Sequence, residues 1–278
     1  MSFIAVMPLS RRAWWLATPL LAIVAFAVLL PFIWRNASLL GQCALGQDCA
    51  AAELFSDGYY LQALLNTVWI SALSTVLALL IGLGAALAVA QAPQRHGPVA
   101  LLAGLGANFA GVPLAVALTL LFGAQGLLSA ALAGVGLAVN LYQSSGLLLA
   151  YVCFQVPLAT LLLLAPVRML DGALLEAALT LGATPALFWR RVGLPLLLPS
   201  LVEVGSLLFA NAAAAYATPF ALSGTAANVL AVRIASLVSG DIFSQPELSA
   251  LLALLMFVML VAVIGGGRLL AARLRRIG

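Results

Sequence analysis

Six long apolar stretches dominate this sequence and limit what it can fold into. A helix needs about 20 apolar residues to cross the hydrocarbon core of a bilayer, and each stretch reaches that length. Backbone amides inside lipid must be paired within their own segment, so we expect six membrane-spanning helices. Barrel strands would be about ten residues long and alternating in polarity, which these stretches are not. They run approximately over residues 13–33, 62–91, 99–122, 146–167, 196–218 and 247–267.

The composition agrees with an all-α membrane protein. Of the 278 residues, 65% are hydrophobic and 7% are charged, whereas soluble domains carry about 25% charged residues. The first stretch follows Arg11 and Arg12, as the apolar core of a signal peptide would. It is longer than such a core, and Trp34-Arg35 follows it instead of a small-residue cleavage site. We therefore expect the first helix to be retained.

Arginine predicts the orientation of these helices. If the N-terminus is cytoplasmic, ten arginines fall on the inside and only Arg35 and Arg233 fall outside. Cytoplasmic loops carry such an excess, so we expect both termini in the cytoplasm and residues 34–61 outside. The net charge of +4 is scattered over helix ends and predicts no nucleic-acid partner. The ten inside arginines are Arg11, Arg12, Arg95, Arg168, Arg190, Arg191, Arg268, Arg273, Arg275 and Arg276.

A seventh span over residues 123–145 is the main alternative topology. The segment is moderately apolar, but five glycines lie between residues 123 and 146. A span here would also reverse every later helix and place Arg168 and the C-terminal arginines outside. We instead expect an interfacial or re-entrant segment on the outer face.

The outer loop carries Cys43 and Cys49, six residues apart. Disulfides persist in an oxidising outer compartment, so both a bridge and a pair of free thiols remain open. No histidine or further cysteine accompanies them, so we expect no metal site. His96, the only histidine, is interpreted as a solvated group in the cytoplasmic turn over residues 91–98.

Signals for covalent chemistry are missing from the sequence. The chain contains no lysine, which a nucleotide-binding Walker A loop requires. We therefore expect no enzymatic activity and no cofactor in this chain. Glu203 is the one carboxylate within a span. Such acids are functional candidates, although this one also lies near the expected cytoplasmic end, where it can reach water or an arginine.

A polar insertion over residues 168–195 separates the fourth stretch from the fifth. Asp171 can cap a first short helix over 172–181, and Gly182 follows it where a left-handed residue is favoured. Thr184-Pro185 can then start a second short helix. A helix with a small-residue surface suits a groove on another protein. The alternative is an amphipathic loop on the headgroups, which explains Arg190 and Arg191 but not the spacing described next.

The polar insertion contains Glu176-Ala177-Ala178, three residues, Gly182, nine residues, and then Val192-Gly193-Leu194-Pro195. This pattern resembles the EAA loop of the membrane subunits of binding-protein-dependent ABC importers, with Val192 in place of the usual isoleucine. From about residue 60 onward, the helix arrangement is similar to the permease core of type I ABC importers. The resemblance implies a first helix and outer loop over 1–61, and a five-helix core over 62–278.

The resemblance also implies partners. These are a separate cytoplasmic ATPase dimer that holds ATP and Mg, an external solute-binding protein, and a second permease, either another copy or a homologue. The location it implies is the bacterial inner membrane. The residues assigned by resemblance to the ATPase contact are Leu174, Glu176, Ala177, Ala178, Gly182, Ala183, Pro185, Phe188 and Pro195.

The solute is less constrained. Residues 215–224 and 238–241 are similar to permeases of the spermidine/putrescine group, which implies a polyamine or a similar small polar compound. Relatives of that group for phosphonates, thiamine and ferric iron remain alternatives, as does a secondary transporter, although inverted repeats and coupling acids are not visible. The candidate path residues are Asn108, Glu203, Asn211 and Tyr216. They can equally be helix–helix hydrogen-bonding groups.

Overall fold

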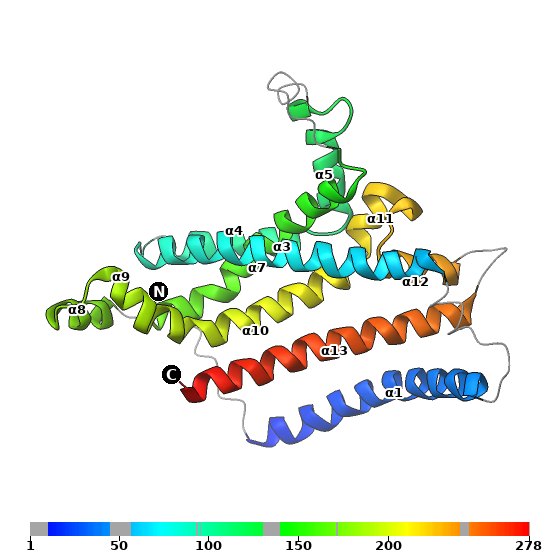
Figure 1. Cartoon of the computed structure of the whole chain (residues 1–278), viewed down its shortest axis with the longest axis horizontal. Helices are drawn as coiled ribbons and strands as arrows, with labels where there is room; N and C mark the ends of the chain where they lie inside the picture. Colours follow the sequence, from blue (N-terminus) through cyan, green and yellow to red (C-terminus); the bar gives the residue numbers. More distant parts are fainter. Residues whose placement is uncertain are drawn as a thin grey trace.

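Helices form all the regular structure that the computed structural model describes (Figure 1). The described residues are 11–44, 57–92, 94, 96–129, 140–170, 172–239 and 245–277. Five helical segments among them are long and apolar enough to cross a membrane, and a sixth is added if one bent helix pair counts as a span. The chain is therefore an all-helical, multi-pass membrane protein. The five segments are Gly58–Ala90, Val112–Ser129, Ser144–Arg168, Pro185–Ala213 and Pro246–Arg276.

The centre of the bundle is formed by α3 (Gly58–Ala90), α7 (Ser144–Arg168) and α10 (Leu194–Ala213). Small residues bring the first two helices close, since a Cβ added to Gly82 would lie 2.7 Å from the Cβ of Ala159. Helices in lipid associate through such close backbone approach. Gln155 on α7 is fully buried, and its Nε2 donates a hydrogen bond to the carbonyl of Leu208 on α10 at 3.0 Å.

Two further helices lie along one side of this centre. The long α13 (Pro246–Ile277) packs on α10, where a Cβ on Gly267 would lie 2.6 Å from Ser206 Oγ. α1 (Arg11–Ala44) covers the first predicted stretch and contacts α13 through the rings of Phe32 and Phe257, whose centroids are 6.0 Å apart. In Figure 1, α1 begins and α13 ends at the same end of the bundle. We call this the inner end; its location in the cytoplasm stays a prediction.

The third predicted stretch is broken. The prediction of one helix over 99–122 is wrong, because α4 (His96–Asn108) and α5 (Val112–Phe122) are separate helices that point in different directions. Gly111 between them has a φ of 76°, which side chains with a Cβ disfavour. Its N–H donates to Thr218 Oγ1 at 3.0 Å, so a distant part of the chain holds the break. Of the segment 123–145, residues 130–139 lie outside the described residues.

The connection between the fifth and sixth stretches, here called the last outer connection, is helical and partly buried. It contains α11 (Ala217–Ser223), a 3₁₀ turn (Gly224–Ala226) and α12 (Leu230–Ser239), and the two parts are bent by 68°. The N–H of Leu230 donates to Thr67 Oγ1 on α3 at 2.8 Å. The side chain of Leu230 is fully buried. This segment is therefore part of the bundle and not a surface loop.

Candidate functional site

The first helix of the polar insertion is α8 (Gly172–Thr180), as the sequence predicts. It extends away from the inner end of the bundle beside α9 (Pro185–Phe188) (Figure 1). The side chains of Leu174 and Leu179 are 41% and 43% exposed, and that of Leu181 just beyond the helix is 88% exposed. Within the described part of the chain, α8 therefore leaves much of its apolar surface without a partner.

The end of α8 has the geometry that its glycine predicts. Gly182 has a φ of 83°, in the left-handed region, and its N–H donates to the carbonyl of Leu179 at 2.9 Å. The N–H of Ala183 reaches back to the carbonyl of Ala178 at 3.0 Å. These two bonds form a Schellman motif. No atom lies within 4 Å of a Cβ built on Gly182, so the backbone conformation and not crowding favours glycine here.

The second helix of the polar insertion starts as expected but does not stop. Thr184 is its N-cap, accepting a hydrogen bond on Oγ1 from the N–H of Leu187 at 3.3 Å, and Pro185 is the first helical residue. After α9 the chain continues through a π-helical turn, Trp189–Gly193, directly into α10. The segment Pro185–Ala213 is therefore one unbroken helical span. The prediction of a separate short second helix is wrong.

Two aromatic side chains fix the π-helical turn against its neighbours. Phe188 is 4% exposed, and its ring meets that of Trp189 edge to face at 6.0 Å. A Cβ on Gly193 would lie 2.7 Å from Trp189 Cε3, so only glycine lets the indole lie against the backbone. Phe188 thus packs within the chain, unlike the other residues that the resemblance assigns to a partner contact.

Most of those other residues lie at the surface of the polar insertion. Leu174, Glu176, Ala177, Gly182, Pro185 and Pro195 are exposed, and Ala178 and Ala183 are partly buried. The structure thus gathers the predicted contact residues, Phe188 excepted, on the surface of a segment that extends from the inner end. Asp171, the expected cap of α8, lies outside the described residues.

Of the two interpretations of Glu203, the structure favours the one in which the carboxylate reaches an arginine. Its Oε1 lies 2.6 Å from Nη2 of Arg275 near the end of α13, with the two side chains 36% and 57% exposed. The carboxylate therefore pairs with an arginine near the inner end of the bundle. This ion pair joins α10 to α13.

The other three path candidates lie further along the bundle. Asn108 ends α4, and its Nδ2 donates to the carbonyl of Gly104 at 2.8 Å. Asn211 is exposed in the last turn of α10. Tyr216 immediately precedes α11 and stacks on Phe220 with ring centroids 5.1 Å apart.

The break after Asn108 is joined to the start of α11 by the bond from Gly111 to Thr218. The structure therefore brings the segments around Asn108 and Tyr216 together, and it places Glu203 apart from them. The exposed side chains at this junction include two aromatic rings, of Phe109 and Tyr216. Sequence reasoning selected Asn108 and Tyr216 but not the hydrogen bond between Gly111 and Thr218 that joins their segments.

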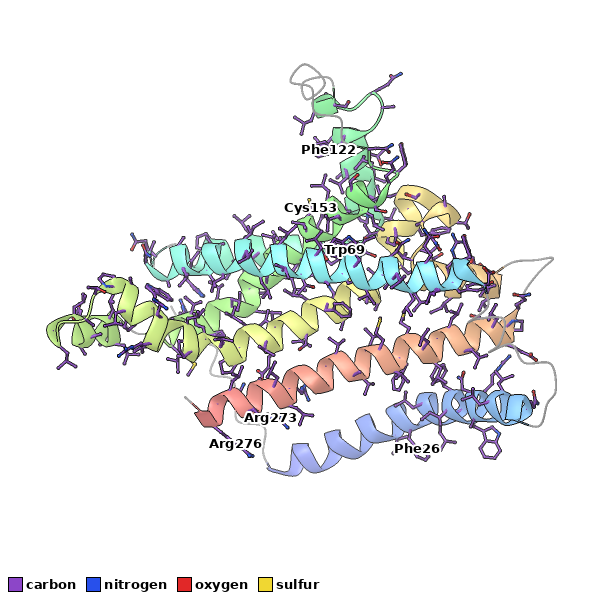
Figure 2. The ribbon with its side chains drawn as sticks, in the orientation of Figure 1. Phe26, Trp69, Phe122, Cys153, Arg273 and Arg276 are labelled. Atoms are coloured by element: carbon purple, nitrogen blue, oxygen red, sulfur yellow. The ribbon has the colours of Figure 1, made fainter. Side chains whose placement is uncertain are left out.

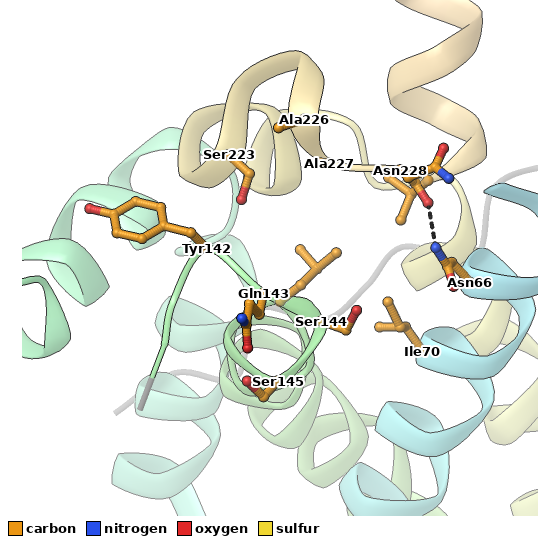
Figure 3. A pocket seen from close by; sticks show the side chains of 12 residues that line it. Asn66, Ile70, Tyr142, Gln143, Ser144, Ser145, Ser223, Ala226, Ala227 and Asn228 are labelled. Carbon is orange, nitrogen blue, oxygen red and sulfur yellow. Dashed lines mark hydrogen bonds between the residues drawn. The ribbon is translucent and has the colours of Figure 1, made fainter. Parts of the chain in front are cut away.

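A cleft of about 410 Å³ opens at the opposite, outer end of the bundle, between α3, the start of α7 and the bend before α12 (Figure 3). Asn66 Nδ2 donates to the carbonyl of Asn228 across it at 3.1 Å. Ser144 and Ser145 line its floor at the first turn of α7. Arg233 donates through Nε to Asn228 Oδ1 at 3.1 Å, which orients that amide. None of the described residues that line the cleft is charged.

Sequence reasoning missed this cleft. Asn66 is a polar residue inside an apolar stretch, the same signal that selected Asn108 and Asn211. Asn228 gave no such signal, because it lies in a segment interpreted as a connection. Cys43 belongs to α1, but Cys49 lies outside the described residues, so both a bridge and a pair of free thiols stay open. Cys153 is a free thiol on α7. No cluster of metal-binding side chains occurs among the described residues.

Three curated proteins illustrate what the chain is similar to; no family model matches it. It is 30% identical over 266 residues to the probable ABC transporter permease protein y4fN of Sinorhizobium fredii, covering 92% of this chain and 46% of that protein. It is 29% identical to the trehalose transport system permease protein SugB of Mycobacterium tuberculosis, covering 85% and 86%. It is 32% identical to the spermidine/putrescine permease PotC of Haemophilus influenzae, covering 47% and 49%. The chain thus spans about half the length of the first of these relatives.

Solved structures agree on the fold. A chain in the crystal structure of a bacterial alginate ABC transporter with an alginate-bound periplasmic protein superposes with a TM-score of 0.71 at 17% identity, covering 94% of this chain and 95% of that one. A chain of the MetNI methionine ABC transporter in an inward-facing conformation gives 0.59 at 17% identity, covering 77% and 95%. The relatives over most of the sequence and the shared fold lead to one family. The homologues of this chain are permeases of ABC transporters.

Proposed function

We propose that this chain is the membrane-spanning permease subunit of an ATP-driven importer and that its polar insertion docks on a separate ATPase. The chain itself carries out no covalent chemistry. ATP binding would close the ATPase dimer, and the polar insertion would carry that motion into the spans by alternating access. The observation that carries the proposal is the contrast between α8, whose apolar side chains are exposed, and the unbroken helix Pro185–Ala213 to which it is joined.

The proposed topology follows the arginine distribution. Six spans would place both termini and the polar insertion in the cytoplasm, with the broken pair α4 and α5 as the third span. In support, α1 begins and α13 ends at the end of the bundle from which α8 extends. We place the protein in the bacterial inner membrane.

The proposed partners are an ATPase dimer, a second permease and an external solute-binding protein. One subunit of this size does not enclose a two-fold path, so a second copy or a homologue is needed. The alginate transporter neighbour, which was crystallised with its periplasmic protein, supports a binding-protein partner. We propose no nucleic-acid partner, metal or cofactor for this chain.

The proposed solute is a small polar compound. The relatives named above transport trehalose or spermidine and putrescine, so a polyamine is one member of this class. The described residues that line the outer cleft offer no carboxylate to a polycation, so they give a polyamine no electrostatic support there. Calorimetry with the solute-binding protein encoded beside this chain would identify the class.

Replacing Gly182 tests the docking proposal. Gly182→Asp places a Cβ at a left-handed position, at a cost of about 1–2 kcal/mol, and adds a carboxylate that docking would bury at a cost of a few kcal/mol. We expect normal abundance in the membrane, loss of ATPase co-purification and no uptake. Retained ATPase with wild-type transport would refute the docking role.

Gly224→Asp is the matched control. Gly224 also has a left-handed φ, 58°, and also has no atom within 4 Å of a built Cβ, but it lies in the last outer connection. The two variants therefore each place a Cβ at a glycine with positive φ, one at each end of the bundle. Only the change at Gly182 should release the ATPase; equal loss from both variants would indicate general destabilisation.

A further inference from the structure

A second hollow lies at the inner end of the bundle, apart from the exposed surface of α8. It is a groove of about 580 Å³ between the end of α7, the π-helical turn with the start of α10, and the end of α13. Its walls are mostly apolar side chains. The lining residues of the walls are Pro166, Met169, Val192, Pro195, Leu196, Pro199 and Leu274.

The polar lining of this groove is basic. Arg191 and Arg275 both line it, together with Ser200. Arg275 is already paired with Glu203, whereas the structure gives Arg191 no carboxylate partner among the described residues. The groove therefore combines one unpaired positive charge, a second cation held in an ion pair, and a hydrocarbon-like wall.

The length of α13 places this groove at the level of lipid headgroups. Its 32 residues extend over about 48 Å, whereas the hydrocarbon core of a bilayer is about 30 Å thick. The last turns of the helix, with Arg273, Arg275 and Arg276 (Figure 2), thus emerge from that core. A groove at this depth meets phosphates at its mouth and acyl chains along its wall.

We propose that this groove binds one anionic phospholipid, with its phosphate on Arg191 and an acyl chain along the apolar wall. Basic pockets between spanning helices on the cytoplasmic side suit anionic headgroups. A free phosphate or nucleotide would satisfy the arginine but would leave the apolar wall unused. The bound lipid would wedge between α7, α10 and α13 at the point where the polar insertion joins the bundle.

Native mass spectrometry of the full chain in detergent tests this site by titration with phosphatidylglycerol. We expect one site that is tighter for phosphatidylglycerol than for phosphatidylcholine with the same acyl chains. Arg191→Gln should weaken that site about fivefold, since a cation near an anionic headgroup contributes about 1 kcal/mol. Arg191→Lys keeps the charge and should retain most of the affinity.

Arg190→Gln is the matched control, because Arg190 is adjacent to Arg191, is exposed as Arg191 is, and does not line the groove. It should leave lipid binding unchanged. Equal losses from Arg190→Gln and Arg191→Gln would overturn the proposal in favour of diffuse surface charge. Equal wild-type binding of phosphatidylcholine would overturn it without any variant, as would displacement of the lipid by inorganic phosphate at the same concentration.

Discussion

Two helical segments lie outside the long spans, α8 at the inner end and α12 at the outer end. They differ in how far their apolar side chains are buried. Leu230 on α12 is fully buried, and the backbone at its start is hydrogen-bonded to α3. Leu179 on α8 is 43% exposed, and the described hydrogen bonds of α8 are local. Close packing and hydrogen bonds between helices stabilise a bundle in lipid, so α12 contributes to this chain's own fold. The apolar surface of α8 has no such partner among the described residues.

The largest expected effect comes from truncating a buried side chain of α12. Leu230→Ala removes a fully buried side chain, and such truncations cost about 2–5 kcal/mol. Thermal unfolding in detergent should show a clear loss of stability. Leu179→Ala is the counterpart on α8 and should change stability by less than about 0.5 kcal/mol, while weakening co-purification of the ATPase. Equal losses of stability would remove the distinction between the two helices.

A smaller effect is expected at the bond that fixes α12. Thr67→Ala leaves the buried N–H of Leu230 without its acceptor, and an unsatisfied buried donor costs about 1–3 kcal/mol. Thermal unfolding of the purified protein measures this loss. Thr67→Ser keeps the hydroxyl and should recover most of the stability. Similar losses from both substitutions would mean that the methyl group, and not the hydrogen bond, holds the helix.

The smallest effect is expected at the ion pair between Glu203 and Arg275. Both side chains are more than a third exposed, and exposed pairs contribute about 0–1 kcal/mol. A double-mutant cycle with Glu203→Gln and Arg275→Gln should give a coupling energy within that range, decreasing as salt is added. A coupling of several kcal/mol would show that the inner end is held as firmly as the outer one.

Local signals predicted the polar insertion well. The glycine at position 182 predicted the left-handed end of α8, and Thr184-Pro185 predicted the next helix start, because both depend on the backbone of a few neighbouring residues. The continuation of that helix into α10 was missed. Pro195 lies in the first turn of α10, directly after the π-helical turn Trp189–Gly193.

The elements that the sequence did not predict depend on distant partners. The break at Gly111 is held by Thr218, and the start of α12 is held by Thr67. Neither partner is close in sequence, so neither contact leaves a local pattern. The outer cleft was missed for the same reason, since Asn66 and Asn228 lie 162 residues apart in the chain.

The sequence by itself determined that this chain is a helical membrane protein with a polar insertion, because span length and helix-end chemistry are local properties. Tertiary structure decided which side chains meet: Glu203 with Arg275, the α4–α5 break with α11, and α12 with α3. Inside an apolar bundle, nearly every helix face is hydrophobic, so periodicity does not distinguish a buried face from a lipid-facing one. Close approach at small residues and a few long-range hydrogen bonds make that choice, and they exist only in the folded chain.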